Sequence, residues 1–554
     1  MPQYPKNELA QLTIASCIAH QLEHVVISPG SRNAPLTIGF YNHPNIKTYS
    51  IVDERCAAFF ALGLAQQLQK PVAVVCTSGS ALLNYYPAVS EAFYSDIPLV
   101  VISADRPKHL IDIGDGQTVR QENVFENHCL FSANLIVNDG SKDENLNLLD
   151  YALRVATYEN GPVHINIPFD EPLYDVVDEI LTLEPANTEI GEEPIALEEL
   201  EQYASIWNSS TKKMVLIGAN YPDELLQVQL NKIIEDDSVI VVTETTSNVY
   251  NKQFINSIDK VIFPLDAIDF EALQPEILLT LGGMIVSKKI KQYLRKHQPK
   301  HHWHVDSKKA FDTYFCLDKH FDISPQLFFS QFFFLTSAIE SEYQSSWLKI
   351  KEHRGTQHAT YLESCPYSDL KVFESVLESI PNNTHLQLGN SSIIRYTQLF
   401  DMNTSLDIFC NRGTSGIDGS TSTAIGAAHV NKNQTVFITG DISFFYDSNA
   451  LWNKHIKNDF RIILINNNGG GIFKVIPGPK ATNALSYFET PHGLTAMQLC
   501  EMYKIEYSTA NNLNELNVSL PDFYTESEHP KLLEVFTPSQ ENDTVLKEYF
   551  KAIK

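Results

Sequence analysis

Two short polar motifs, each at the end of an apolar run, have the donor types that bind a divalent metal ion. Gly440-Asp441 ends the run QTVFITG, and Asn467 and Gly469 follow the run FRIILIN. A carboxylate, an amide oxygen and a backbone carbonyl make half of the octahedral oxygen shell that Mg2+ prefers, and water and phosphate oxygens complete it. Because glycine lets the backbone approach closely, the pattern predicts a site for a diphosphate with Mg2+, or with Mn2+ as the alternative ion.

Each motif also has an ordinary structural explanation. Asp441 could cap the helix that follows it, and the Asn-Gly run could form a tight turn. The combination favours the metal site, because a helical crossover is predicted over about residues 447–457, between the two strands. Right-handed βαβ geometry places such strands side by side, so Asp441 and Asn467 are expected to project from adjacent carboxyl ends.

The first third of the chain alternates short β-branched runs with helical patterns. The runs HVVISPG, PVAVVCTSG and IPLVVISADRP are among them. This alternation predicts repeated βαβ units, and hence a parallel sheet covered on both faces. Ligands gather at the carboxyl ends of strands in such sheets. The candidate residues at these ends are Ser31, Arg32, Asp53, Glu54, Ser78, Gly79, Asp105 and Arg106.

The sequence as a whole predicts an α/β protein with three doubly wound parallel-sheet domains. An acidic, Pro-containing stretch at 178–200 is typical of a solvated linker, and it ends an N-terminal domain over 1–177. Strand patterns predict a central domain over 201–340, and a polar helical stretch at about 337–365 leads into a C-terminal domain over 341–554. The length agrees, because 554 residues correspond to about three domains.

Composition argues against several classes of protein. The formal net charge of −26, from 41 basic and 67 acidic residues, argues against nucleic-acid binding, which needs clustered positive charge. No apolar run reaches the length of a membrane span, and the start of the chain lacks the basic and apolar regions of a signal peptide. Eight cysteines without a Cys-x-x-Cys pair are typical of reduced core residues, so a cytoplasmic location is expected.

Two other patterns carry little weight. Gly282-Gly283 follows a predicted strand, but no G-x-G-x-x-G motif follows, so a dinucleotide site is disfavoured. His302 and His304 would alternate onto one strand face, but no carboxylate or cysteine lies nearby at ligand spacing, so a metal site is disfavoured there.

Eight stretches in the two outer domains carry a resemblance to a known family. They are ISPGSRNAPL at 27–36, DERCAAFFALGLA at 53–65, TSGSALLNYYPAVSEA at 77–92, SADRP at 103–107, GQTVRQ at 116–121, GNSSIIR at 389–395, NRGTSGIDGSTSTAIGAA at 411–428 and GDISFFYD at 440–447. Gly-Asp followed by a later Asn-Asn is similar to the fingerprint of thiamine-diphosphate enzymes. Together the stretches resemble one family of these enzymes, the 2-succinyl-5-enolpyruvyl-6-hydroxy-3-cyclohexene-1-carboxylate (SEPHCHC) synthases, and the middle domain matches only loosely.

The resemblance implies thiamine diphosphate as cofactor, held by an N-terminal pyrimidine-binding domain and a C-terminal diphosphate-binding domain. Glu54 would bond the aminopyrimidine ring and promote the imino tautomer that removes the thiazolium C2 proton. The ordinary alternative is a first-turn helix residue favoured by the helix dipole. Asp441, Asn467 and the Gly469 carbonyl are the implied metal ligands, and Ile417 would support the bent cofactor. The other implied cofactor-binding residues are Ser391, Gly440, Ile442, Ser443, Ile472 and Phe473.

The reaction implied by the resemblance joins two carboxylate substrates. 2-Oxoglutarate is decarboxylated, and the resulting succinyl unit is added to isochorismate, in menaquinone biosynthesis. Arginine binds carboxylates through its rigid two-pronged guanidinium, and Arg32 and Gln117 join Glu54 as implied catalytic residues. The implied substrate-binding residues are Ser31, Arg32, Arg106, Gln117, Lys288, Lys289, Ser391, Arg395 and Arg412. A dimer or a pair of dimers is also implied, with each site between two subunits.

Two alternatives stay open at this point. One is another thiamine-diphosphate carboligase or decarboxylase, such as an acetolactate-synthase-like enzyme that uses pyruvate. The other is a non-catalytic cofactor-binding subunit with the same fold, although the presence of Glu54, Asp441 and Asn467 speaks against it.

Overall fold

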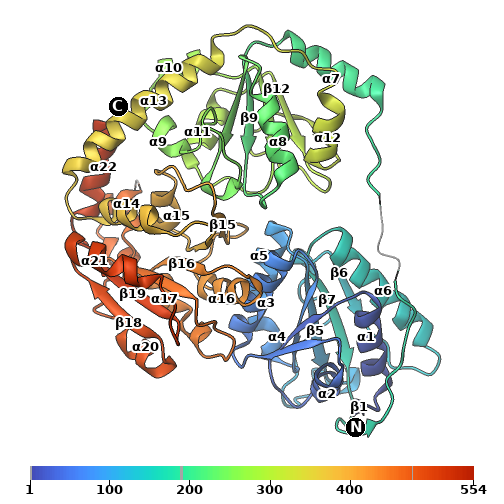
Figure 1. The fold of residues 1–554 in the computed structure, drawn as a ribbon. Helices are drawn as coiled ribbons and strands as arrows, with labels where there is room; N and C mark the ends of the chain where they lie inside the picture. Colours follow the sequence, from blue (N-terminus) through green and yellow to red (C-terminus); the bar gives the residue numbers. More distant parts are fainter. Residues whose placement is uncertain (1–2, 187–190, 477) are drawn as a thin grey trace.

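The computed structural model describes residues 3–186, 191–476 and 478–554, which form three parallel sheets covered by helices (Figure 1). The predicted α/β class with three doubly wound sheets is therefore confirmed. Residues 187–190, part of the predicted acidic linker, lie outside the described residues. Among the residues that are described, no helix is both long and apolar enough to cross a membrane.

The N-terminal sheet has the strand order β3-β2-β4-β5-β7-β6, and all neighbouring strands are parallel. Its strands are β2 His24–Ile27, β3 Lys47–Ser50, β4 Val72–Cys76, β5 Leu99–Asp105, β6 Phe131–Asn134 and β7 Val163–Pro168. Its helices are α1 Glu8–Ala19, α2 Ala34–Asn42, α3 Glu54–Leu68, α4 Ser80–Asn84, α5 Tyr86–Ser95 and α6 Lys142–Tyr158. A short antiparallel pair, β1 Tyr4–Pro5 with β8 Val176–Val177, fastens the start of the chain. Strands β4 and β5 are buried along their whole length, which explains their continuous apolar runs.

The central sheet has the order β10-β9-β11-β12-β13 and is also parallel. Its strands are β9 Lys213–Ile217, β10 Val239–Thr243, β11 Ile277–Leu281, β12 His301–Val305 and β13 Leu317–Phe321. Its helices are α7 Leu197–Ser209, α8 Glu224–Ile233, α9 Ile258–Ile262, α10 Ala267–Ala272, α11 Lys288–Lys296 and α12 Pro325–Phe332. His302 and His304 both contact the Thr280 hydroxyl, at 3.0 and 2.8 Å, so the two rings take part in a hydrogen-bonded network of side chains on the central sheet.

The C-terminal sheet has the order β15-β14-β16-β17-β19-β18. Its strands are β14 His385–Leu388, β15 Asp407–Cys410, β16 Thr435–Gly440, β17 Arg461–Asn466, β18 Glu506–Ala510 and β19 Lys531–Phe536. Its helices are α13 Tyr343–Ser364, α14 Asp369–Ser379, α15 Ser392–Thr397, α16 Ser420–Val430, α17 Asp441–Tyr446, α18 Ile472–Val475, α19 Leu485–Glu489, α20 Met497–Tyr503, α21 Leu513–Phe523 and α22 Asn542–Ala552.

The crossover between β16 and β17 differs from the sequence-based expectation. The prediction of a helix over about 447–457 was wrong, because α17 begins at Asp441 itself and a 3-10 turn, Ser448–Leu451, follows it. Asp441 lies in the first turn of α17, where an acidic side chain complements the helix dipole. The helix therefore starts directly at the end of β16 and not one turn later.

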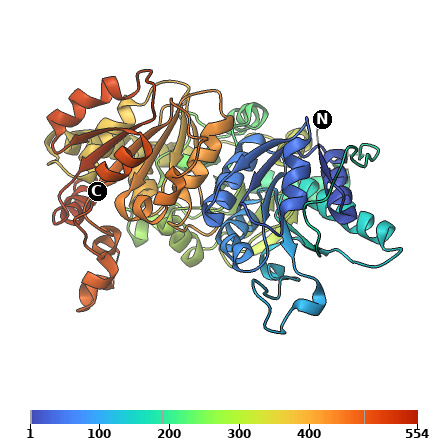
Figure 2. The same ribbon diagram turned by 90° about the horizontal axis from the view of Figure 1, so that it is seen from below.

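The N-terminal and C-terminal domains of the chain are joined by the packing of α3 against α16, and Figures 1 and 2 show the two domains side by side. A Cβ atom on Gly63 of α3 would lie 2.1 Å from the Thr423 carbonyl oxygen. A Cβ atom on Gly426 of α16 would lie 2.1 Å from the Phe60 carbonyl oxygen. The two glycines allow the helix backbones to approach closely, and one apolar core runs through both domains.

Helix α13 contacts the central domain near its start and α22 of the C-terminal domain further along (Figure 1). Near its start, the Gln344 amide donates hydrogen bonds of 2.9 Å to the carbonyls of Ile234 and Val239 in the central domain. Further along, the His358 ring lies 2.8 Å from the Tyr549 hydroxyl of α22. Because α13 contacts both the central and the C-terminal domain, the domain limits at 177, 200 and 340 stay predictions.

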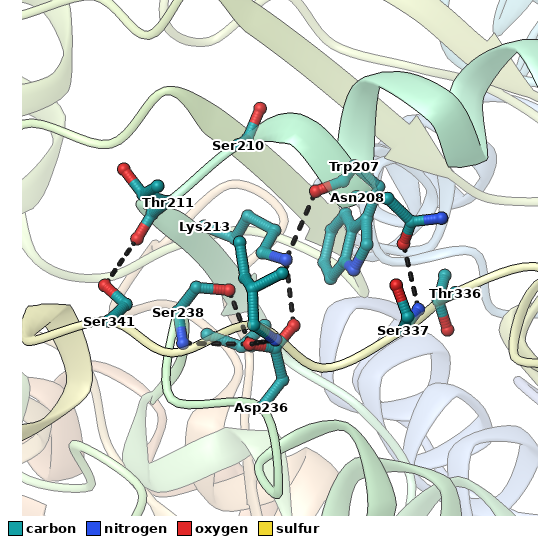
Figure 3. Close-up of polar contacts among 12 residues, drawn as sticks. Trp207, Asn208, Ser210, Thr211, Lys213, Asp236, Ser238, Thr336, Ser337 and Ser341 are labelled. Carbon is teal, nitrogen blue, oxygen red and sulfur yellow. Dashed lines mark hydrogen bonds and ion pairs between the residues drawn. The ribbon is translucent and has the colours of Figure 1, made fainter.

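A buried ion pair fastens the amino-terminal edge of the central sheet (Figure 3). The Lys213 ammonium, with its side chain 0% exposed, lies 2.8 Å from Asp236 Oδ2 and donates to the Trp207 carbonyl. The other oxygen, Asp236 Oδ1, accepts hydrogen bonds from the Ser238 backbone and hydroxyl. The pair therefore connects the end of α7, the start of β9 and the turn before β10.

We expect Asp236→Ala to lower the free energy of unfolding of the central domain by about 3–5 kcal/mol, because it leaves the Lys213 charge buried without a counter-charge. Calorimetry of the whole chain should show the earliest unfolding transition at a lower temperature. Asp175→Ala is the matched control, since the Lys6–Asp175 pair is exposed and 3.7 Å long and contributes at most about 1 kcal/mol. Equal effects of the two substitutions would contradict the prediction.

Candidate active site

A cavity of about 160 Å³ lies at the carboxyl ends of the C-terminal strands. Its walls come from the loops after β14, β16 and β17 and from the starts of α14 and α18. It brings together ten of the residues that the sequence predicted to bind the cofactor or metal: Ser391, Ile417, Gly440, Asp441, Ile442, Ser443, Asn467, Gly469, Ile472 and Phe473. The adjacent parallel pairing of β16 and β17 explains why residues so far apart in sequence meet here.

The Asp441 carboxylate lies in this cavity and is held in place by two backbone N–H groups. Its Oδ2 accepts a hydrogen bond of 2.9 Å from Gly469, and its Oδ1 accepts one of 2.7 Å from Ile442. Gly469 has a φ of +142°, and a Cβ atom there would lie 2.6 Å from the Glu489 carbonyl oxygen, so only glycine fits this turn. Burial raises the pKa of Asp441, so its charged form needs a positive partner beyond these two donors.

The Asn467 side chain presents an oxygen without a partner. Its Nδ2 donates a hydrogen bond of 3.0 Å to Oδ2 of Asp369, which also lines the cavity, and this contact fixes which end of the amide is the nitrogen. Its Oδ1 is buried and accepts no hydrogen bond from any described residue. Buried polar atoms are nearly always paired, so this oxygen and the Asp441 carboxylate fit a bound cation.

Glu54 lies in a different part of the chain, in the first turn of α3. The preceding residue, Asp53, caps that helix by accepting a hydrogen bond of 3.1 Å from the Cys56 backbone. Asp53 also accepts a hydrogen bond of 2.8 Å from the Asn449 amide of the C-terminal domain. Glu54 is partly exposed, and it is absent from the lining of the cavity that holds Asp441.

The other predicted N-terminal residues follow the ends of β2, β4 and β5. The Arg32 guanidinium donates to the Phe169 carbonyl at 3.0 Å, and burial and the nearby charge of Arg106 lower its pKa. Gly79, with a φ of +87°, lies against Gln117, which would be 3.1 Å from a Cβ atom there. Ser31 is adjacent to Arg32 and exposed. These residues share the carboxyl edge of the N-terminal sheet.

Comparison with known proteins agrees with this division into two half-sites. Residues 7–129 match the thiamine pyrophosphate enzyme N-terminal TPP binding domain, and residues 388–535 match the C-terminal TPP binding domain. The SEPHCHC synthase of Flavobacterium johnsoniae is 55% identical, over 99% of this chain and 100% of that protein. Those of Christiangramia forsetii and Flavobacterium psychrophilum are each 54% identical, over 100% and 99% of both chains.

The chain belongs to the SEPHCHC synthase family.

The similarity to SEPHCHC synthases spans the central domain as well, although the sequence motifs marked only the outer two. Family membership makes this chain a thiamine-diphosphate enzyme, as predicted.

Two of the four arginines predicted to bind substrate, Arg395 and Arg412, lie near one another in the C-terminal domain. Arg395 Nη1 donates to the Ser391 carbonyl at 3.0 Å, and Arg412 Nη1 donates to Asn390 Oδ1 at 2.7 Å. Burial and the charge of Arg412 lower the pKa of Arg395, while Asp259 opposes that shift. Arg412 also lines a second cavity, of about 400 Å³, where all three domains meet.

The central-domain lysines are placed differently from one another. Lys288 is exposed, and the Lys289 ammonium lies 5.4 and 5.5 Å from the ring centres of Phe263 and Phe270, which is cation–π geometry. Lys291 was not predicted, yet burial lowers its pKa, and the charges of Glu244 and Arg412 act on it. The Lys291 ammonium donates to the Ile285 carbonyl at 2.8 Å.

Sequence reasoning missed two residues beside the predicted metal ligands. Asp369 accepts from Thr537 and Asn467, and burial raises its pKa to about 6. His492 Nε2 lies 3.3 Å from Asp441 Oδ2. Asp369 follows a Ser helix cap, and His492 stands in an irregular loop, so neither position has a spacing signal that would distinguish it.

Proposed function

We propose that this chain catalyses thiamine-diphosphate-dependent decarboxylation of 2-oxoglutarate and adds the resulting succinyl unit to isochorismate. The products would be SEPHCHC and carbon dioxide, a step in menaquinone biosynthesis. The observation that carries the proposal is full-length identity of 54–55% to curated proteins named SEPHCHC synthase. The cavity with its paired Asp441 and unpaired Asn467 oxygen supports it.

The C-terminal cavity is the proposed seat of the diphosphate and its metal ion. Asp441 and Asn467, with the Gly469 carbonyl, would bind Mg2+ or Mn2+ between them and the diphosphate oxygens. Ile417 would support the thiazolium ring, and its carbonyl is fixed by a 3.1 Å hydrogen bond from Ser443. The remaining lining residues would exclude water. Thiamine diphosphate, when bound, supplies the electron sink for the carbon atom that loses carbon dioxide.

Glu54 is the proposed proton-handling residue. Its carboxylate would hold a proton at the aminopyrimidine ring, in the role that a positioned general acid or base has in proton transfer. The cavity that holds Asp441 is lined by residues of the C-terminal domain alone. We therefore infer that the N-terminal domain of a second copy supplies Glu54 to this cavity, in a dimer or a pair of dimers with two sites per dimer.

Carboxylate recognition is the proposed task of the arginines. Arg395 and Arg412 would bind substrate carboxylates from the C-terminal side, and Arg32, Arg106, Ser31 and Gln117 from the N-terminal side. A guanidinium forms two parallel hydrogen bonds with a carboxylate, so these residues orient the substrates as well as bind them. Ser391, Lys288 and Lys289 complete the proposed set, and we add Lys291, because the charge of Arg412 helps to lower its pKa.

Release of carbon dioxide from labelled 2-oxoglutarate tests this proposal. We expect release in the presence of thiamine diphosphate and Mg2+ to depend on isochorismate, and pyruvate to be a poor substitute. An acetolactate-synthase-like enzyme would instead prefer pyruvate, and a non-catalytic subunit would release nothing with either substrate. Each of these results would contradict the proposal.

A further inference from the structure

We infer that Glu91 is a positioning residue that sets the loop of Arg412, so that the N-terminal domain of a chain prepares the substrate arginine of its own C-terminal domain. The inference rests on the proposed function for the role of Arg412. The juxtaposition itself, a buried carboxylate of α5 against the loop after β15, is independent of that function.

Glu91 is 1% exposed and makes four hydrogen bonds through its two oxygens. Oε1 accepts from the Gly413 backbone and the Ser95 hydroxyl, both at 2.8 Å. Oε2 accepts from the Thr414 backbone at 2.7 Å and the Thr414 hydroxyl at 2.8 Å. Among the described residues no cation pairs with Glu91, so N–H and O–H donors alone compensate its burial, and three of the four belong to this loop.

The loop packs directly against α5. A Cβ atom on Gly413 would lie 2.7 Å from both the Glu91 carbonyl oxygen and Ser95 Oγ, so the backbone itself contacts the helix. Arg412 directly precedes Gly413. Any change that releases Gly413 from Glu91 therefore moves the residue whose guanidinium is proposed to bind substrate.

The opposite side of the loop is held by Asn390 of the C-terminal domain. Its Nδ2 donates to the carbonyls of Asn411 and Gly416, each at 2.7 Å, and its Oδ1 accepts from Arg412 Nη1 at 2.7 Å. The loop is thus fixed between one side chain from each domain. Asn390 orients the guanidinium, and Glu91 fixes the backbone on which that guanidinium is mounted.

Glu91→Gln tests the inference, because the glutamine amide has nearly the same shape as the carboxylate. Its NH2 group, however, would face N–H and O–H donors and could not accept hydrogen bonds from them. We expect kcat/KM for the carboxylate substrates to fall about 10- to 100-fold, mostly through KM, since hydrogen bonds to a charged group are lost. The Kd for thiamine diphosphate should stay within about twofold of wild type. Thr414→Val removes one hydroxyl donor and should give a smaller loss in the same direction, while Ser95→Ala, the matched control, should stay near wild type.

A double-mutant cycle separates positioning from general damage. In an Arg412→Ala background, Glu91→Gln and Thr414→Val should each cause little further loss, because the residue that they position is gone. If Glu91→Gln lowers kcat/KM by the same factor in the Arg412→Ala background as in the wild-type chain, the inference is overturned. If the wild-type chain turns neither substrate over, the proposed function fails, and Glu91 is then tested by hydrogen exchange alone.

Hydrogen exchange of the Gly413 and Thr414 amides needs no turnover. In Glu91→Gln we expect exchange in the 411–416 segment to be at least about tenfold faster, with exchange in the 467–471 segment unchanged. Unchanged protection of 411–416 would show that Glu91 does not hold the loop and would overturn the inference.

Discussion

Asp441→Ala should abolish activity and weaken thiamine diphosphate binding by more than about 100-fold, because loss of an outer partner of a metal ligand alone costs 10- to 100-fold. The substitution removes a carboxylate that lines the same cavity as the unpaired Asn467 oxygen. Without it the metal ion lacks its main protein charge, and the diphosphate lacks a counter-charge. Calorimetric titration with the cofactor and Mg2+ measures the effect directly.

A series of variants with graded effects on cofactor affinity provides the controls. Asp369→Asn changes the partner of the Asn467 and Thr537 side chains but leaves the Asp441 carboxylate in place, so its loss of cofactor affinity should lie between those of wild type and Asp441→Ala. Chelation of divalent metal from the wild-type protein should reproduce the Asp441→Ala result, and added Mg2+ should reverse it. Binding of thiamine diphosphate to Asp441→Ala as tightly as to wild type would refute the metal site.

Mixing two inactive variants should restore activity. Glu54→Gln removes the ionisable group at the start of α3, and Asp441→Ala removes the metal ligand, so each homodimer should be nearly inactive. If the two residues act on one cofactor from different chains, a mixed dimer carries both lesions in one site and none in the other. Random exchange makes about half of the dimers mixed, each with one good site of two, so recovery should approach about a quarter of wild-type activity.

The control for this experiment is proof of exchange. Native mass spectrometry of differently tagged subunits should show mixed dimers before activity is measured. A matched pair, Asp441→Ala mixed with Asn467→Ala, should not recover, because both lesions lie in the same half-site. A Glu54→Gln and Asp441→Ala mixture that exchanges fully and stays inactive would place both residues in one chain's site and contradict the shared-site proposal.

The pair Asp441 and Asn467 shows what sequence can predict here. Their juxtaposition follows from chain topology alone, because two consecutive parallel strands joined by a right-handed crossover must end side by side. The helix boundary within that crossover did not follow, because the first acidic residue after β16 serves both as helix start and as lining of the cavity. The local sequence pattern does not show that Asp441 both starts a helix and lines the cavity.

Buried polar contacts between domains are the part that sequence could not predict. Glu91 stands in an ordinary amphipathic helix, and nothing in its spacing shows that its carboxylate contacts a loop 322 positions away. Lys288, Lys289 and Lys291 are close in sequence, yet Lys288 is exposed, Lys289 lies over aromatic rings, and the Lys291 ammonium donates to the Ile285 carbonyl at 2.8 Å. Such contacts depend on how whole domains pack against one another, and short sequence motifs do not predict that packing.

One labelling experiment tests the proposed reaction most directly. The protein is incubated with thiamine diphosphate, Mg2+, isochorismate and 2-oxoglutarate that carries carbon-13 at every carbon, and the products are weighed by mass spectrometry. The proposed reaction predicts SEPHCHC with four labelled carbons, together with one molecule of labelled carbon dioxide for each molecule of SEPHCHC. A product without those four carbons, or labelled carbon dioxide released at the same rate without isochorismate and without a joined product, would contradict it.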